Sequence, residues 1–468
     1  MKIRACYTCL FAAAMFMACA GQSYGQARAT ITPTAPGYTK MPPVSLNSIR
    51  TLSPSPVLVY PAGAATSKGH IAFDENGASV STNFVHHAAS TNNAANANSA
   101  VIGNGTLFGL DTVPTFEGAF AATGGPDMGN VFPYVMMGND PLLGGRTEIP
   151  AKITTVSLTL LNDDGTVRAT ISYNPFEDIT LDSPVFQNAL YSDGRSQFTD
   201  AIQRAEFFNT MKPNWHTQLN PTVVNRVEVT VPRHILVQFP DGTIRSVQNY
   251  FFGTAPNGDH FVELLDLFFN SIFFNAAVND INAGNYTTDA FNMQFYPNTF
   301  LFSIDSSGNP AGCCVLGFHN YIYEPGVAPE PRWIFSFSSW ISPGLLGAGF
   351  QDVTALSHEV SEAFNDPFGD TVVPTWQFPN VPANVQACQG NLETGDPVEV
   401  LPDATVAIPL KENHKIFTFH PQTEALLQWF TQGPASNAID GAFSYPDETA
   451  LPHSALPCPP PPPPPPAP

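Results

Sequence analysis

The sequence has few charged residues, and basic residues are especially scarce. Only 12% of its 468 residues are charged, and 39 acidic residues against 18 Lys and Arg give a formal net charge of −21. Such a chain repels phosphate groups, which argues against nucleic acid or an anionic membrane surface as a partner. A small, neutral or basic partner fits this charge better.

Long apolar runs are absent beyond the N-terminus. The nearest candidate, FVELLDLFFNSIFFNAAV from Phe261, carries Glu263 and Asp266, so it predicts a buried helix over about 258–280 and no transmembrane span. Beyond residue 27, the Gly-x-Ser-x-Gly elbow and a phosphate-cradling glycine loop are also absent. These absences disfavour a serine hydrolase and a nucleotide-dependent enzyme.

The first residues have the pattern of an export signal. Lys2 and Arg4 precede an apolar run from about Ala5 to Ala20, and small residues follow. This pattern predicts a signal peptide over 1–27, and hence a secreted protein, extracellular or periplasmic. A Pro/Thr-rich flexible linker would follow at 28–48.

Cysteines are few once the signal is removed. Of the seven, Cys6, Cys9 and Cys19 would leave with it, so the mature chain would keep Cys313, Cys314, Cys388 and Cys458. An oxidising compartment favours disulfides over a thiolate metal site. We expect Cys388 to pair with Cys313 or Cys314, with the vicinal pair as the alternative.

Region 49–250 is predicted to be rich in strands. ITTVSLTLLNDDGTVRATISYNP alternates apolar and polar residues around an Asp-Asp-Gly turn at 163–165, and VEVTVPRHILVQFPDGTIRSV repeats the pattern around Pro-Asp-Gly at 240–242. Between these hairpins, QFTDAIQRAEFFNTM has apolar residues at helical spacing. The adjacent His86 and His87 fall in a polar, low-complexity loop, where solvation is the expected role.

The C-terminal region 446–468 ends in PCPPPPPPPPAP. This composition predicts an extended polyproline II segment, which can serve as a stiff spacer or dock in an aromatic groove. The spacer is the simpler interpretation.

The stretch QDVTALSHEVSEAFNDPFGD, residues 351–370, predicts a helix over 352–366 that Pro367 terminates. At 100° per residue one stripe is apolar, and His358 and Glu362 lie on the opposite face. Asp352 is a plausible N-cap. The members of the apolar stripe are Val353, Leu356, Val360, Ala363 and Phe364.

His358 and Glu362 are four residues apart, so one ion can touch both side chains. Glu359 follows the histidine, as the general base does in the zinc-protease motif HExxH, with Glu362 in place of the second His. A carboxylate is a harder ligand than imidazole. The site tolerates zinc, which is the expected cofactor, but it discriminates less against manganese or calcium than a set of histidines would.

A third ligand is needed. Asp366 would lie about 12 Å along the helix axis from His358, too far to share an ion without a sharp turn. Glu393 and Asp396, in CQGNLETGDPVEV, are better candidates. We expect Glu393 to be the ligand, with Asp396 as its substitute or in a supporting role.

Other histidines have weaker indications. His319 lies in an apolar strand, where a core histidine with one hydrogen bond is the more common outcome. His414 and His420 flank the apolar segment KIFTF and could stabilise an oxyanion.

SHEVSEAFNDP followed by LETGDP resembles a secreted bacterial family treated as zincin-like, which has an S-H-E-x-x-E-x-x-T-D-P helix and a later G-E-I-x-D-x-C segment. The core is also similar to the plant Exordium or phosphate-induced proteins, whose neighbouring Cys-Gly-Phe-His and Gln-Trp strands correspond here to CCVLGFHNYI and ALLQWF. The resemblance spans about 253–438. It departs from the pattern where Asn365 replaces Thr and Val398 replaces the final Cys.

This resemblance implies a set of site residues. Glu359 would be catalytic, and the metal ligands would come from His358, Glu362, Glu393 and Asp396. Supporting neighbours would be Asp366, His319 and Trp429.

Together these observations predict an α+β protein. Its strand-rich N-terminal region, 49–250, would join a zincin-like half, 251–445, in which a mixed sheet covers the HExxE helix. The predicted function is a secreted zinc-dependent peptidase that hydrolyses peptide bonds of a peptide or protein substrate. The alternatives are a non-catalytic exported cell-envelope or extracellular-matrix protein, with a structural ion or none and an extracellular polymer as partner, and a calcium-stabilised adhesion module.

Overall fold

A computed structural model describes residues 44–45 and 113–458, apart from 240, 256, 325–330, 347–349, 380–387, 413, 414 and 436. The predicted signal peptide, most of the linker, the His86–His87 pair, His414 and the proline run lie outside the described residues. The fold is a strand-rich α+β structure, built on a curled mixed sheet, with 43% of the described residues in strands and 18% in helices.

The strands of the described part, in chain order, are β1 (Val44–Ser45), β2 (Thr115–Ala121), β3 (Val131–Met137), β4 (Arg146–Leu161), β5 (Val167–Ile171), β6 (Ala189–Tyr191), β7 (Gly194–Ser196), β8 (His216–Val231), β9 (His234–Gln238), β10 (Ile244–Gln248), β11 (Tyr250–Thr254), β12 (His260–Leu265), β13 (Phe291–Pro297), β14 (Thr299–Ile304), β15 (Pro310–Val315), β16 (Gly317–Tyr323), β17 (Arg332–Trp340), β18 (Val372–Gln377), β19 (Cys388–Asn391), β20 (Ile408–Glu412), β21 (Lys415–Phe419), β22 (Glu424–Ala425) and β23 (Ser444–Tyr445). The helices are α2 (Asn174–Leu181), α3 (Phe198–Glu206), α4 (Asp266–Ala283), α5 (Thr354–Asn365), α6 (Asp396–Glu399), α7 (Leu427–Phe430) and the 3₁₀ helix η3 (Ile439–Gly441).

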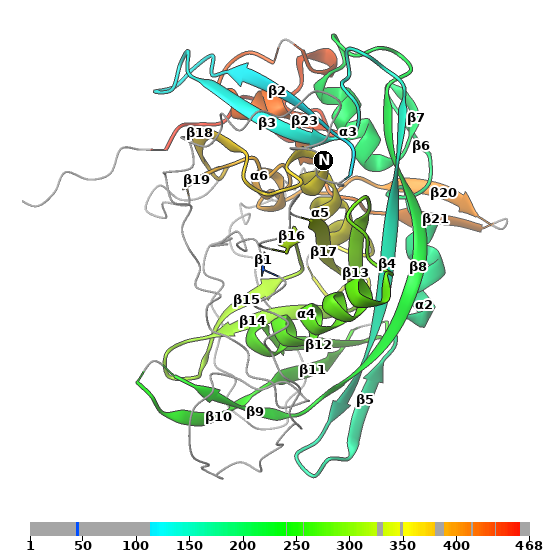
Figure 1. The fold of residues 1–468 in the computed structure, drawn as a ribbon, viewed down its shortest axis with the longest axis vertical. Coiled ribbons are helices and arrows are strands. Elements are labelled where there is room, and N and C mark those ends of the chain that lie inside the picture. Colours follow the sequence, from blue (N-terminus) through cyan, green and yellow to red (C-terminus); the bar gives the residue numbers. More distant parts are fainter. Residues whose placement is uncertain are drawn as a thin grey trace, which may run out of the picture.

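The central sheet has the strand order β1-β16-β17-β13-β4-β5, with β8 paired to β4. It contains strands that precede and strands that follow residue 250, the predicted boundary between the two regions. β13 is parallel to both β17 and β4, whereas β16 is antiparallel to β17. The long strands β4 and β8 run beside each other along the molecule (Figure 1).

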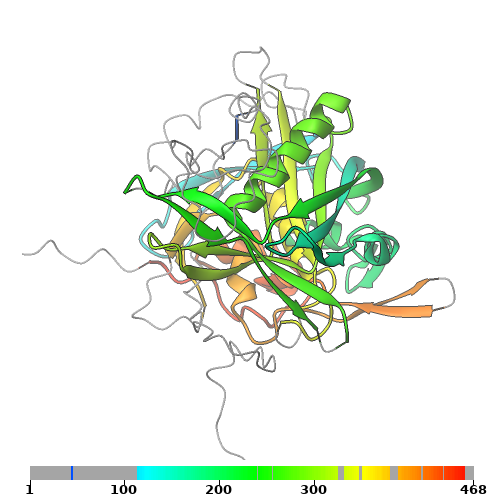
Figure 2. The ribbon, with the colours of Figure 1, turned by 90° about the horizontal axis from the view of Figure 1, so that it is seen from below.

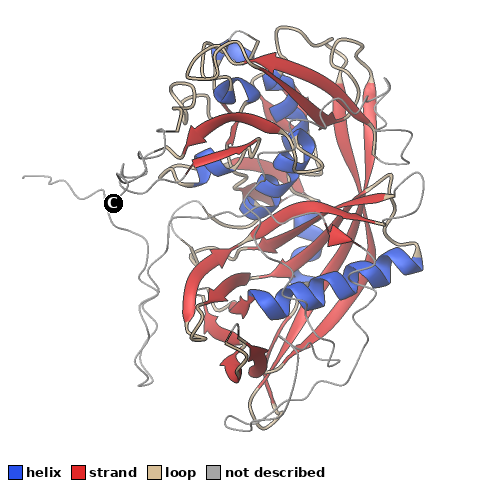
Figure 3. Ribbon diagram, turned by 60° about the vertical axis from the view of Figure 1, so that its left-hand side comes forward, coloured by secondary structure: helices blue, strands red, loops and turns tan. Residues whose placement is uncertain are grey.

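The two faces of this sheet are covered by different helices. In β13, Phe291, Met293 and Phe295 belong to the core cluster that contains the apolar residues of α5, whereas Tyr296 belongs to the cluster around α4. This follows from the two-residue period of a strand, which sends alternate side chains to opposite faces. Helix α5 therefore lies on one face of the sheet, and the long helix α4 lies across the strands on the other (Figure 3).

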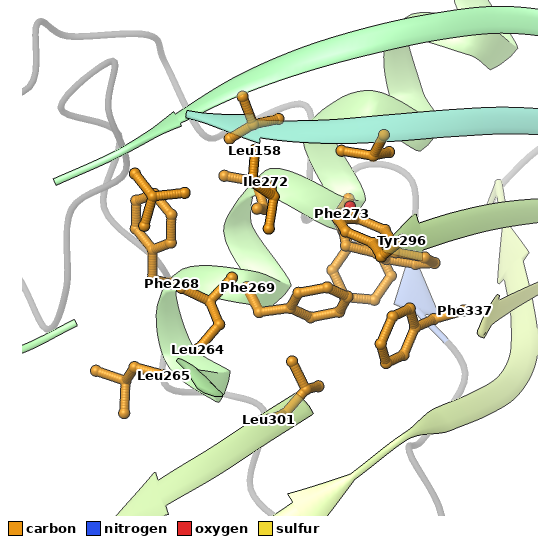
Figure 4. Packing of buried hydrophobic residues seen from close by; sticks show 14 of the residues in the cluster. Leu158, Leu264, Leu265, Phe268, Phe269, Ile272, Phe273, Tyr296, Leu301 and Phe337 are labelled. Carbon is orange, nitrogen blue, oxygen red and sulfur yellow. The ribbon is translucent and has the colours of Figure 1, made fainter. Parts of the chain in front are cut away.

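Helix α4 begins later than the sequence predicts. Residues His260–Leu265, expected to be helical, form β12, which pairs with β11 and β14. The helix starts at Asp266 and ends at Ala283, and the next residue, Gly284, has a left-handed φ of 74° that terminates it. Its aromatic side chains pack closely. Phe269 meets Tyr296 and Phe337 of the sheet (Figure 4), and Phe273 meets Phe335.

Both predicted hairpins are confirmed. β4 pairs with β5 around residues 162–166, and β9 pairs with β10. The predicted helix between them is α3, which is buried along its whole length. A further hairpin, β20–β21, extends away from the body of the protein (Figure 2). None of the helices in the described part combines the length and hydrophobicity needed to cross a bilayer.

The disulfide pairing differs from the preferred prediction. Cys313 pairs with its neighbour Cys314, and Cys388 pairs with Cys458. The expectation that Cys388 would reach Cys313 or Cys314 was wrong, because those residues lie on β15, in the sheet β11-β12-β14-β15, whereas Cys388 begins β19, which pairs with β18. The Cys388–Cys458 bond ties β19 to the segment that precedes the proline run.

Candidate metal centre

Helix α5 is buried on all sides. The predicted apolar stripe packs on the sheet, and the polar face that carries His358 and Glu362 is covered as well. The helix is slightly shorter than the predicted 352–366. Asp352 precedes it, with φ of 45°, and its carboxylate accepts hydrogen bonds from the backbone N–H groups of Val353 and His420.

The carboxylates of Glu362 and Asp396 both approach the ring of His358. Its Nε2 atom lies 3.2 Å from Glu362 Oε2 and 3.8 Å from Asp396 Oδ1. Ligands about 2.0–2.2 Å from a tetrahedral zinc ion are roughly 3.3–3.6 Å from one another. The two distances from His358 Nε2 lie within about 0.2 Å of this range. Asp396 Oδ2 accepts a hydrogen bond from Gln389, which leaves Oδ1 facing His358.

The other nitrogen of His358 faces Gln422. Nδ1 lies 3.3 Å from Gln422 Oε1, and Gln422 Nε2 donates to the Gly395 carbonyl at 2.7 Å. Because the amide oxygen of Gln422 can only accept, Nδ1 carries the hydrogen. The lone pair of a neutral His358 then lies on Nε2, toward the carboxylates. Such outer partners fix the tautomer of metal-binding histidines.

A second histidine, His319 on β16, joins the group. Its Nδ1 lies 3.2 Å from Glu359 Oε2 and 3.5 Å from Glu362 Oε2. The sequence favoured a core histidine here, with a supporting role implied by the resemblance. The structure places it in direct contact with two predicted site carboxylates.

Two glycines give the group its space. A Cβ atom on Gly395 would lie 2.4 Å from His358 Nδ1, and one on Gly317 would lie 2.5 Å from Glu359 Oε1. Gly317 and His319 are two residues apart on β16, so both face α5. Glycine at both positions lets the backbone approach the functional side chains closely.

Ligand atoms therefore gather in two groups, each within 4.8 Å: His319, Glu359 and Glu362 form one, and His358, Asp396 and Glu399 the other. Glu359 Oε1 is 4.0 Å from His358 Nε2, so the two groups adjoin. Buried groups of this composition can hold a metal ion.

Burial and neighbouring charges shift the pKa values of the titratable groups in this centre. Burial raises the pKa of the Asp396 and Glu424 carboxyls well above the ordinary range, and it also raises the pKa of Glu359. Burial acts to lower the pKa of His358 and His319, but Glu362 and Glu359 outweigh it, and both pKa values are raised. Burial would raise the pKa of Glu362, yet the two histidines hold it below its ordinary value. Binding of a cation would therefore release protons.

The remaining predicted residues lie outside the two ligand groups. Glu393 is buried and its charge acts on His319 and Asp396, but it belongs to neither ligand group. Asp366 accepts hydrogen bonds from the backbone N–H groups of Asp370 and Thr371 and so orders the loop after α5. Trp429 packs against Trp376 in the core. His420 Nδ1 lies 2.8 Å from Asp352 Oδ2, just before the start of α5.

Two acidic residues of the centre were missed from the sequence. Glu399 lies on the short helix α6, three residues after Asp396, and Glu424 lies on β22. Glu424 is fully buried, and its charge acts on His358, Glu362 and Glu359. Its signal in the sequence is a lone charge in the uncharged run PQTEALLQWF.

The fold and the site together define a strand-rich α+β protein with a buried His/carboxylate group able to hold a metal ion. Comparison of the chain with protein-family models, curated proteins and solved structures finds no match. The resemblance to the zincin-like and Exordium families therefore stays a prediction.

Proposed function

We propose that the protein is a secreted, metal-dependent peptidase with a zincin-like active site on α5. The observation that carries the proposal is the convergence of His358 Nε2, Glu362 Oε2 and Asp396 Oδ1, with Glu359 Oε1 beside them at 4.0 Å from His358 Nε2. His358, Glu362 and Asp396 would hold the ion. Asp396 takes the place of Glu393 as the preferred third ligand.

The donor set fits zinc and also manganese or calcium. One imidazole nitrogen with two carboxylate oxygens is harder than a set of histidines, so it selects zinc less sharply. When bound, the ion supplies Lewis acidity that polarises the scissile carbonyl and makes water more acidic. The two anionic ligands reduce that acidity relative to a three-histidine site.

The protein residues carry the proton transfers. Glu359 accepts a proton from the attacking water through Oε1 and delivers it to the leaving amine nitrogen as the C–N bond breaks. His319 Nδ1 lies 3.2 Å from Glu359 Oε2, and this contact fixes the orientation of the carboxylate. Gln422 keeps the His358 Nε2 lone pair directed at the ligand group. A neutral or basic peptide suits the net charge of −21.

Replacement of Glu359 by Gln tests this proposal. The variant removes the proton acceptor and keeps the shape, so hydrolysis of a peptide library should fall by at least about a hundredfold. Bound metal, measured by mass spectrometry, should remain. Glu228→Gln, an exposed change on β8, serves as the matched control and should retain activity. Full activity in Glu359→Gln would exclude this mechanism.

The burial of the centre favours a second candidate function, an exported cell-envelope or extracellular-matrix protein with a structural ion. Glu359, Glu362 and Asp396 are exposed by only 5%, 3% and 2%. Closed sites of this kind are typical of structural metals. Chelation would then lower the melting temperature of a protein that hydrolyses no peptide in the same library.

A further inference from the structure

One carboxylate oxygen lies between the two imidazoles of the centre. Glu362 Oε2 is 3.2 Å from His358 Nε2, on the same helix, and 3.5 Å from His319 Nδ1, on β16. Glu362 Oε1 is occupied differently, since it accepts a hydrogen bond from Gly395 N at 3.1 Å. Glu362 belongs to the His319 group, and its Oε2 atom also lies within reach of His358 in the other group.

The centre has more ligand-bearing side chains than one ion needs. Four carboxylates are almost completely buried: Glu359, Glu362, Asp396 and Glu424, exposed by 5%, 3%, 2% and 0%. Buried charges are costly unless they are paired or coordinate metals. Together with the two imidazoles, the carboxylates of the two adjoining groups supply more ligand atoms than one four-coordinate ion uses.

Glu424 gives an independent indication. Neither of its side-chain oxygens meets a donor at hydrogen-bond geometry in the described part of the chain, the Thr394 hydroxyl included. Its charge acts on His358, Glu362 and Glu359, so its carboxyl lies near the centre. Without a cation nearby such a buried carboxyl keeps its proton, as its raised pKa indicates, whereas a bound cation would stabilise its ionised form.

We propose that the centre holds two divalent cations, one on each side of Glu362 Oε2. The first is bound by His358 and Asp396, the second by His319 and Glu359 Oε2, and Glu362 bridges them. Two-metal hydrolases place their ions about 3.5–4 Å apart, a separation that one shared oxygen allows. Glu424 balances the added charge, and Glu359 Oε1 still faces the first ion.

This inference rests on the metal centre of the proposed function but requires no peptide hydrolysis. The test is manganese loading of chelator-treated, purified protein, with bound metal counted after dialysis and electron paramagnetic resonance of the loaded sample. We expect two equivalents of Mn²⁺ and the spectrum of an exchange-coupled pair. His319→Gln should reduce binding to one equivalent and give an isolated-ion spectrum.

His216→Gln is the matched control, because His216 also pairs with a buried aspartate, Asp200, outside the centre. It should retain two equivalents. If His319→Gln does not fold, Glu424→Gln replaces it and should weaken the second ion at least tenfold. One equivalent with an isolated-ion spectrum in the unmodified protein would overturn the two-ion centre and leave the proposed function standing. If neither manganese nor zinc, loaded in parallel, binds to the protein, both the two-ion centre and the proposed function are overturned.

Discussion

At the residue scale, the absence of a side chain at Gly395 leaves room for the ring of His358. Its backbone angles are ordinary, with φ of −80° and ψ of −39°, so alanine is conformationally acceptable and acts only through its added methyl group. That methyl would meet the His358 ring at 2.4–2.7 Å. The Gly395→Ala variant should therefore displace the imidazole and weaken metal binding about 10–100-fold, as loss of outer support does at other metal sites.

Gly390→Ala is the control for this variant. Its added methyl would meet nothing closer than Thr375 Cγ2 at 3.7 Å, which is ordinary contact. Isothermal titration with zinc measures both affinities. Equal affinities for the two variants would show that the His358 ring does not contribute to binding.

The sequence predicts only part of the centre. Spacing along one helix brings His358, Glu359 and Glu362 together, because residues four apart share a face. Asp396 was a candidate because it lies in an acidic segment downstream. His319 and Glu424 come from β16 and β22, and their approach to α5 depends on how the sheet and the C-terminal segment pack. Local periodicity contains no information about that packing.

At the scale of elements, α5 is held by its apolar stripe. Leu356 is 3% exposed and packs in the cluster between the helix and the sheet. Leu356→Ala should lower the free energy of unfolding by about 2–5 kcal/mol through lost burial and the cavity left behind. Leu143→Ala, at a leucine that is 76% exposed, should change it by less than about 0.5 kcal/mol. Urea denaturation compares the two, and similar losses would contradict this packing.

The sequence predicts element types better than their boundaries. Strict alternation around Gly-containing turns identified both hairpins correctly. The start of α4 was misplaced because FVELLDLFF is apolar at nearly every position, and such a run suits a buried strand as well as a buried helix. Pairing of β12 with β11 and β14 on both sides decides in favour of the strand.

For the whole molecule, Glu206 predicts a pH dependence of stability. Burial raises its pKa from 4.5 to about 8 in the folded protein, where Oε1 accepts a hydrogen bond from Leu427 N. Between these values the unfolded chain has released a proton that the folded protein keeps. The contribution of this group to the free energy of unfolding is therefore at its full value below pH 4.5. It decreases as the pH rises to 8, by up to about 1.4 kcal/mol per pH unit.

Glu206→Gln should remove this contribution, because the amide keeps the acceptor and cannot ionise. Urea denaturation at pH 5 and pH 8 should show that the variant gains stability relative to the unmodified protein at the higher pH. The exposed change Glu228→Gln should leave the pH dependence unaltered. An identical dependence in all three proteins would mean that Glu206 does not keep its proton.

The two disulfides should differ in their effect on global stability. Cys388 and Cys458 are separated by 70 residues, so their bond restricts the unfolded chain by roughly 4 kcal/mol in the loop-entropy treatment. Cys313 and Cys314 are adjacent and close no such loop. Replacing Cys388 and Cys458 by Ser should lower the melting temperature much more than replacing Cys313 and Cys314. The reverse order would contradict the observed pairing.

The most direct test of a metal centre on α5 is the metal content of the protein, measured by mass spectrometry after purification without chelators or a histidine tag. The His358→Ala/Glu362→Ala variant is measured beside it, with circular dichroism to establish that both are folded. We predict at least one equivalent of zinc or manganese in the protein and its loss in the variant. Equally folded proteins that both lack metal would contradict the account.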